Sequence, residues 1–238
     1  MLKNRDDLIE NIRDYYQKSL TVLKEFGGPS IYFHTQCIKE KKNSFLSKRH
    51  IELIYATLTA WGMHRMGDPE ITKTKLVEFD VFIASILQSQ NVFEELRDHR
   101  MECISLDEYN HILDKLHLPY NTLQVSISEA SIVANSKTLA HLLPDLIPPI
   151  DRQYTIRFFT QEDRNFFRKN GKYRTVNLPV GKDNQFFLFK RICCEMKNLL
   201  DDCDLNTFEL DDRSFNTSYP KIIDNIIMAY VKSIPKPI

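Results

Sequence analysis

Apolar residues recur at helical spacing along most of this chain, and this periodicity restricts its fold more than any other feature. In the segment 6–26, for example, Leu8, Ile12, Tyr15 and Leu23 share one face among charged residues. The same spacing marks the segments 51–66, 76–96, 151–159, 186–200 and 222–230, and the capping pairs Ser105/Glu108 and Ser126/Glu129 precede shorter helices. We therefore predict an all-α fold.

The composition indicates a folded globular protein without a strong charge bias. Hydrophobic residues make up 42% of the 238 residues and charged residues 27%, which is ordinary for a globular chain. Lys and Arg together number 32, as do Asp and Glu, so any affinity for nucleic acid must come from the distribution of charge. The chain has six glycines and no glycine-rich phosphate loop, which argues against a nucleotide-binding P-loop or Rossmann site.

Cysteine usage and hydropathy favour a cytoplasmic protein. The five cysteines are an odd number without a Cys-x-x-Cys pair, and the first residues carry Asp and Glu where a secretory signal has an apolar run. No apolar run approaches the roughly 20 residues that cross a bilayer, so we expect no membrane insertion. Glu108 and His111 have metal-ligand spacing, but a di-iron bundle needs two such pairs. We expect no metal and no cofactor.

The segment 126–159 combines features that suit chemistry on DNA. Asn135 and Ser136 are residue types that cap helices, and they predict a helix that runs through Leu143. The free N–H groups at the start of a helix can bind phosphate. A proline-rich connector then leads to Asp151, which precedes another helix. A carboxylate at a helix N-terminus stays ionised and can stabilise a cationic sugar while it aligns an attacking water.

This segment resembles the helix-hairpin-helix, Gly/Pro-Asp family of DNA glycosylases. In that family a hairpin presents backbone N–H groups to a DNA phosphate, and a Pro-x-Asp turn places the essential Asp at a helix start. Val133–Leu139 stands where the hairpin would be, Pro149-Ile150-Asp151 stands where the turn would be, and Arg157 lies near the family's recurrent Arg. The resemblance covers about residues 50–160, with Glu52–Trp61 matching the family's early helix more loosely.

The resemblance implies two helical lobes that flank a cleft, within one domain spanning 1–238. The lobes would comprise residues 1–50 plus 160–238, and residues 51–159. It also implies that Asp151 is the catalytic carboxylate and that Lys137 is a Schiff-base nucleophile or a phosphate contact. The partner would be DNA, bound by a monomer, and the activity would be excision of a flipped modified base. A bulky modified pyrimidine of a phage genome and an oxidised or alkylated purine are both admissible, in anti-phage defence or in repair.

Further site residues follow from residue type and position. Aromatic and histidine side chains next to glycine turns are candidates for the base pocket: Tyr32, Phe33, His34, Trp61 and His64. Polar residues of the hairpin and basic residues near Asp151 and in the stretch 164–191 are candidates for contacts with DNA: Asn135, Ser136, Thr138, Arg152, Arg157, Arg168, Lys169, Lys172 and Arg174.

Each of these residues also has a purely structural interpretation. Asp151 could serve only as a helix N-cap, Lys137 could be a solvated surface side chain, and Trp61 could pack in the core. The stretch 164–191 could equally be a solvated basic face. Two other classes of function therefore stay open, namely a helical DNA-binding module without chemistry and a helical protein-interaction domain.

Overall fold

The structure is a computed structural model that describes residues 3–63, 76–128, 130–161, 166–168 and 170–235. It confirms the predicted all-α fold, because these residues contain only helices, turns and two isolated bridges, Leu76–Ser126 and Phe167–Tyr173. The α-helices are α1 (Lys3–Glu10), α2 (Ile12–Leu23), α3 (Pro29–Asn43), α4 (Lys48–Ala60), α5 (Phe79–Leu87), α6 (Gln90–Leu96), α7 (Leu106–Lys115), α8 (His117–Thr122), α9 (Ile132–Leu142), α10 (Arg157–Thr160), α11 (Lys182–Asp201) and α12 (Tyr219–Ser233). A π-helical turn, Arg152–Ile156, precedes α10.

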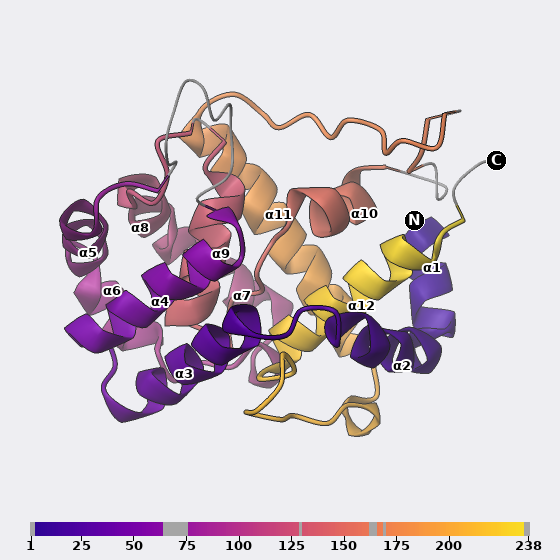
Figure 1. Cartoon of the computed structure of the whole chain (residues 1–238), viewed down its shortest axis with the longest axis horizontal. Coiled ribbons are helices and arrows are strands. Elements are labelled where there is room, and N and C mark those ends of the chain that lie inside the picture. Colours follow the sequence, from indigo (N-terminus) through magenta and orange to yellow (C-terminus); the bar gives the residue numbers. More distant parts are fainter. Residues whose placement is uncertain (1–2, 64–75, 129, 162–165, 169, 236–238) are drawn as a thin grey trace.

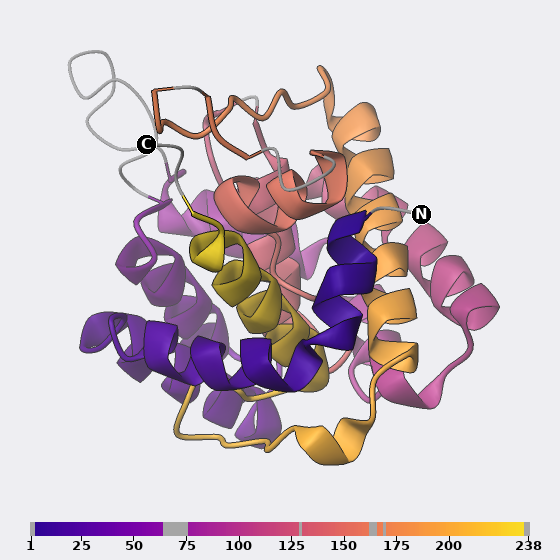
Figure 2. The same cartoon turned by 90° about the vertical axis from the view of Figure 1, so that its right-hand side faces the viewer.

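The helices pack around α9, α11 and α12, which lie in the middle of the molecule (Figure 1). Helix α11 contacts α7, α8, α9 and α12, while α3 packs along α4 and both contact α9. Helices α2 and α12 come from opposite ends of the chain and lie side by side (Figure 2). The expected division into two lobes stays a prediction.

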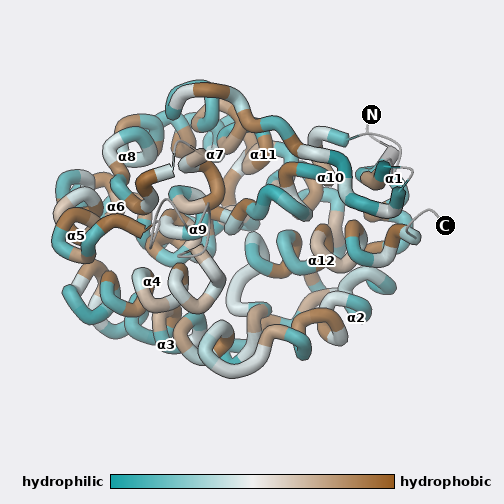
Figure 3. Tube along the Cα trace, turned by 45° about the horizontal axis from the view of Figure 1, so that its top comes forward, coloured by the Kyte–Doolittle hydropathy of each residue, from teal (hydrophilic) through white to brown (hydrophobic). Residues whose placement is uncertain are grey.

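The buried side chains form one hydrophobic cluster that extends from Leu8 to Ile234. Most helices bury one side only, so hydrophobic and hydrophilic residues mix along each of them (Figure 3). Helix α9 is different, because every residue in it except Lys137 is buried. A helix that is covered all round is a central element of the core.

Two predicted elements have different boundaries in the structure. The segment 6–26 contains two helices separated at Asn11, whose ψ of 24° is not helical. The segment 76–96 likewise divides into α5 and α6 around Ser89. The aromatic residues after the glycine turn lie in α3, because Gly28 with φ of 66° turns the chain and proline is favoured at the first helical position.

The hairpin expected over Val133–Leu139 is absent, because the continuous helix α9 spans this segment. The segment has no glycine to provide a tight turn with positive φ. Its short polar side chains instead bond to carbonyls of the preceding turn, as Thr138 Oγ1 does to the Ala134 carbonyl at 3.0 Å. The prediction that Asn135 and Ser136 cap a helix was therefore wrong.

Of the two predicted capping pairs, the first is confirmed, since Ser105 Oγ accepts the N–H of Glu108 at 3.2 Å at the start of α7. The second pair includes Glu129, which lies outside the described residues. None of the described helices is both long and apolar enough to span a membrane.

Candidate active site

A cavity of about 380 Å³ opens where several distant parts of the chain meet. This volume is within the range of about 300–1,000 Å³ that is usual for small-molecule sites. Its walls are mainly apolar and aromatic, with two lysines and two aspartates among them. The lining residues are Leu23, Phe26, Ser30, Ala60, Trp61, Gly62, Lys137, Pro149, Asp151, Tyr154, Phe215, Lys221, Asp224 and Met228.

A second hollow of about 440 Å³ adjoins this cavity and shares Trp61, Gly62, Lys137 and Asp151 with it. The other residues that line this hollow are Met63, Val133, Arg152, Gln153, Arg157, Tyr173, Arg174, Thr175 and Val176. Lys137 and Asp151 therefore stand at the boundary between an aromatic cavity and a hollow with basic walls.

Lys137 is the one side chain of α9 that leaves the core, and it points toward Asp151. Its Nζ lies 3.7 Å from Asp151 Oδ2 and 5.4 Å from the centroid of the Trp61 ring. The Lys137 side chain is only 12% exposed. Lysines are rarely buried without a specific reason. Lys137 extends from an otherwise buried helix into a cavity, which makes it a candidate functional residue.

Asp151 is fixed by the chain that follows it. Its Oδ1 accepts the backbone N–H groups of Gln153 at 2.7 Å and Tyr154 at 3.2 Å, which makes it the N-cap of the π-helical turn. The predicted position at a helix start is thus confirmed. Its side chain is still 35% exposed, and Oδ2 faces Lys137. One oxygen therefore holds the backbone while the other remains available in the cavity.

Ser136 determines where Asp151 lies relative to Lys137. The Ser136 hydroxyl accepts the N–H of Ile150 at 3.1 Å and lies 3.2 Å from the Ile150 carbonyl, within reach to donate to it. This contact attaches the residue before Asp151 to the residue before Lys137. The two charged groups consequently meet although 14 positions separate them along the chain.

Trp61 forms one wall of the cavity and rests on buried histidines. His34 and His141 contact each other, with Nδ1 of His34 3.1 Å from Nε2 of His141, and both rings pack against Trp61. His141 Nδ1 also contacts the Lys137 carbonyl at 2.7 Å. Burial lowers the pKa of His141 to about 4 and holds the pKa of His34 well below its usual range. Neutral imidazoles therefore support this wall at neutral pH.

A second charged pair lies on another wall of the cavity, contributed by α12. Lys221 Nζ donates to Asp224 Oδ2 at 2.7 Å and to Asn225 Oδ1 at 2.6 Å. Thr155 Oγ1 donates to Asp224 Oδ1 at 2.9 Å and also accepts the N–H of Asp151 at 3.3 Å. Sequence reasoning missed this pair. The available signal was three polar residues, Lys221, Asp224 and Asn225, at i, i+3 and i+4 in a mostly apolar helix.

The expected base-pocket residues are only partly brought together. Trp61 lines the cavity and His34 lies behind it, whereas Tyr32 and Phe33 do not line it. Tyr32 is exposed on α3 and packs edge-on against Phe33. His64 lies outside the described residues. The aromatic walls that sequence reasoning missed are Phe26, Tyr154 and Phe215.

The prediction that residues of α9 contact phosphate is wrong. Asn135, Ser136 and Thr138 are buried, and their polar groups bond within the protein, as Asn135 Nδ2 does to the Tyr120 carbonyl at 2.9 Å. A short polar side chain in a buried helix satisfies neighbouring backbone groups. These residues therefore support the site from within the core.

Arg157 is likewise a structural residue, which corrects the expectation that it contacts DNA. It is buried, and its guanidinium donates to carbonyls of Gln153, Phe166 and Arg174 while it stacks on the Tyr173 ring at 4.4 Å. These bonds attach the segment 166–176 to the turn that follows Asp151.

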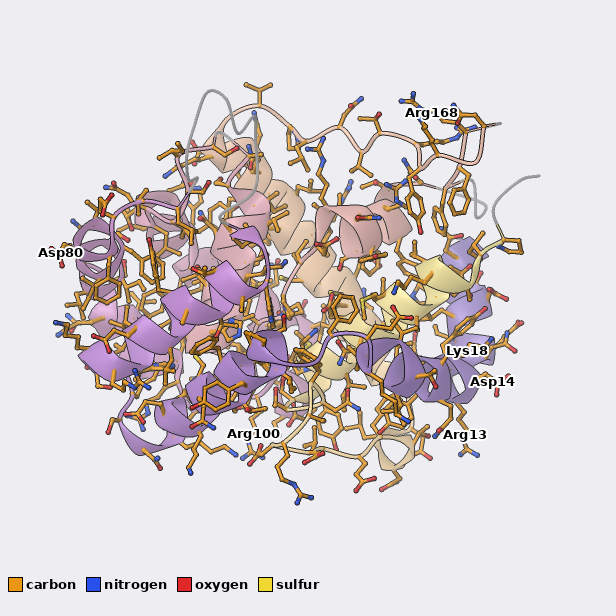
Figure 4. All side chains as sticks on the ribbon, in the orientation of Figure 1. Arg13, Asp14, Lys18, Asp80, Arg100 and Arg168 are labelled. Atoms are coloured by element: carbon orange, nitrogen blue, oxygen red, sulfur yellow. The ribbon has the colours of Figure 1, made fainter. Side chains whose placement is uncertain are left out.

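The remaining basic candidates that the structure describes are exposed: Arg152, Arg168, Lys172 and Arg174. Arg152 and Arg174 line the adjoining hollow. Arg168 lies above α10 (Figure 4), in a hydrogen-bonded turn in which its N–H donates to the Lys172 carbonyl at 2.7 Å. Lys169 is outside the described residues. The structure thus brings two of these arginines next to Asp151.

Comparisons with protein-family models, with curated proteins and with solved structures find no match for this chain. Within the part of the chain that the structure describes, no group of three His, Cys, Asp or Glu side chains could hold a metal ion.

Proposed function

We propose that this chain is a DNA glycosylase that excises a modified base from a flipped nucleotide. The observation that carries the proposal is the Lys137–Asp151 pair, at 3.7 Å, at the mouth of an aromatic cavity. A flipped base needs an apolar slot with stacking surfaces, and Trp61, Tyr154 and Phe215 supply such walls. The base would enter the cavity while its sugar remains beside the charged pair.

The chemistry follows from the carboxylate. As the glycosidic bond breaks, its electron pair leaves with the base and positive charge develops on the deoxyribose. The Asp151 carboxylate stabilises that charge and accepts a proton from the attacking water, whose oxygen forms the new bond to the sugar carbon. Because Asp151 is held by two backbone N–H groups, it need not reorganise during the reaction.

The adjoining hollow supports a path for the DNA strand. Arg152 and Arg174 line it beside Asp151, and guanidinium groups suit phosphate oxygens. A strand whose phosphates follow these arginines would present one nucleotide to the cavity. Phosphate contacts position the duplex without selecting its sequence.

Asp151→Asn tests the proposal. Asparagine caps a helix as well as aspartate does, so the turn should fold while the negative charge is lost. We expect the release of a modified base from duplex DNA to fall by a factor of at least about 100, with duplex affinity and the melting temperature nearly unchanged. Base release is measured by cleavage of the abasic product in hot alkali.

A matched control is Asp204→Asn, because Asp204 also caps a short helix and does not line the cavity. This variant should release the base at the wild-type rate. Full activity in Asp151→Asn would exclude the mechanism. The absence of release by the wild-type chain from duplexes that carry alkylated, oxidised, deaminated and bulky modified bases would exclude the function.

A further inference from the structure

The Lys221–Asp224 pair is nearly enclosed, yet it faces the cavity. The two side chains are 11% and 13% exposed, and both line the cavity together with the aromatic walls. An enclosed ion pair contributes little net stability, because desolvation offsets most of the attraction between the charges. A second charged pair in a ligand cavity is therefore better explained by recognition than by stability.

This pair retains hydrogen-bonding capacity that a ligand could use. An ammonium group has three donors, and Asp224 and Asn225 take two of those of Lys221. No acceptor among the described residues bonds to the third donor of Lys221. Each oxygen of Asp224 accepts one hydrogen bond, from Thr155 or from Lys221, and each has a further lone pair. The wall thus presents one donor next to one acceptor.

The charges around Trp61 restrict which base can stack there. Lys137 Nζ and Lys221 Nζ lie 5.4 Å and 5.7 Å from the centroid of its ring. These positions are within the distance of about 6 Å at which a cation interacts with an aromatic ring. A cationic alkylated base stacked on Trp61 would compete for the ring with these two ammonium groups, whose charges Asp151 and Asp224 balance, whereas a neutral base would not.

We propose that Lys221 and Asp224 recognise the edge of the flipped base and select a neutral base with adjacent carbonyl and N–H groups, such as a uracil-type or an oxidised guanine-type base. This inference rests on the proposed function. Lys221 donates to the carbonyl oxygen, and Asp224 accepts the N–H. When the glycosidic bond breaks, its electron pair delocalises onto that oxygen, where the ammonium stabilises it until the base takes a proton from solvent.

Trp61 provides a direct readout, because it is the only tryptophan of the chain. Deoxyuridine and a deoxyadenosine methylated at N1, which is cationic and has no carbonyl group, are titrated separately into the protein while tryptophan fluorescence is followed. We expect the wild-type protein to prefer deoxyuridine. In Lys221→Met this preference should fall about tenfold, the effect of one hydrogen bond to a charged group.

The control is Lys197→Met, since Lys197 is also buried and ion-paired, with Asp201, but does not line the cavity. It should keep the wild-type preference. Lys221→Gln decides the matter if the Met variant fails to give a cooperative melt, because glutamine still donates to Asp224 but has no charge. It should also lose the preference.

The outcomes separate this inference from the proposed function. An unchanged preference in the Lys221 variants, or no preference in the wild-type protein, overturns base recognition by this pair, even if base release from duplexes is observed. A preference that depends on Lys221, without base release from any duplex, supports the recognition and excludes the glycosylase activity.

Discussion

Lys137 is the residue whose role most needs a chemical test, because its amine lies beside Asp151 at the cavity mouth. If Asp151 takes a proton from the ammonium and the amine attacks the sugar carbon, the base departs with the bonding electrons. The bond from that carbon to the ring oxygen then breaks, the ring oxygen takes up a proton, and an imine forms between the enzyme and the opened sugar. Borohydride reduces such an imine to a stable amine. We expect a covalent protein–DNA adduct on denaturing gels with wild-type protein and substrate duplex, and none with Lys137→Ala.

Lys41→Ala is the matched control, since Lys41 is also largely buried and lies 3.4 Å from an aspartate, Asp145, remote from the cavity. This variant should still be trapped. Base release by the wild-type protein without any adduct would show that water is the nucleophile and that Lys137 acts only as a positive charge.

At the residue scale, sequence reasoning could find Asp151 and Lys137 but not the residues that hold them. Asp151 was predicted from the Pro-x-Asp turn and Lys137 from the resemblance to the glycosylase family, and the structure places them together. Ser136 was expected to bind phosphate, yet its hydroxyl contacts Ile150 inside the core. The sequence does not distinguish these two roles of a serine, because its hydroxyl can bond to backbone groups at a helix end or to backbone groups inside the core.

Among the elements, the segment 166–176 is the one whose interaction with DNA can be tested without knowing the substrate. Arg168, Lys172 and Arg174 are exposed on it, and each phosphate that they neutralise releases counterions. We expect the triple change of these residues to Ala to weaken binding to any duplex. It should also reduce the dependence of log affinity on log salt by about one unit per lost contact, measured by fluorescence anisotropy.

The comparison variant changes Lys39, Lys42 and Lys48 to Ala, which are exposed on α3 and α4. It should leave the salt dependence as it is in the wild-type protein. The reverse result, in which only the changes on α3 and α4 reduce the slope, would place the DNA path over those helices and would leave the segment 166–176 as solvated surface.

The helices themselves were largely predictable, whereas their ends and their environment were not. Apolar periodicity reveals that a segment is helical, because one face must be buried. It does not reveal a break such as that at Asn11, where the chain changes direction to pack α2 against α12. It also failed at α9, which is covered on all sides, so that its polar residues resembled a turn between two shorter helices.

At the scale of the whole molecule, the cavity depends on contacts that no local pattern encodes. Its walls come from α2, α3, α4, α9, the segment 149–154, α12 and the loop residues Phe26 and Phe215, which the core brings together from across the chain. Lys221 and Asp224 were missed for this reason, since nothing in their own segment relates them to Asp151. Thr155 links this pair to Asp151, because its hydroxyl accepts the N–H of Asp151 and donates to Asp224.

Buried histidines should make the stability of the whole molecule depend on pH. Burial lowers the pKa of His50 and of His141 to about 4, and that of His34 also falls because of burial and its proximity to His141. In the unfolded chain a histidine has a pKa of about 6.5. Between these values the unfolded chain binds protons that the folded chain does not, so stability decreases as the pH falls through this window.

From about pH 7 to about pH 5 we expect each of His50 and His141 to contribute a loss of about 2 kcal/mol in the free energy of unfolding. Urea denaturation at the two pH values measures this loss. His141→Gln removes one of the titrating groups, so it should lose about 2 kcal/mol less than the wild-type protein on acidification, even if it is less stable at pH 7.

His111→Gln, at an exposed position of α7, is the control and should follow the wild-type protein. Equal acid sensitivity of His141→Gln and the wild-type protein would mean that His141 is protonated in the folded state, which is incompatible with a neutral imidazole behind Trp61.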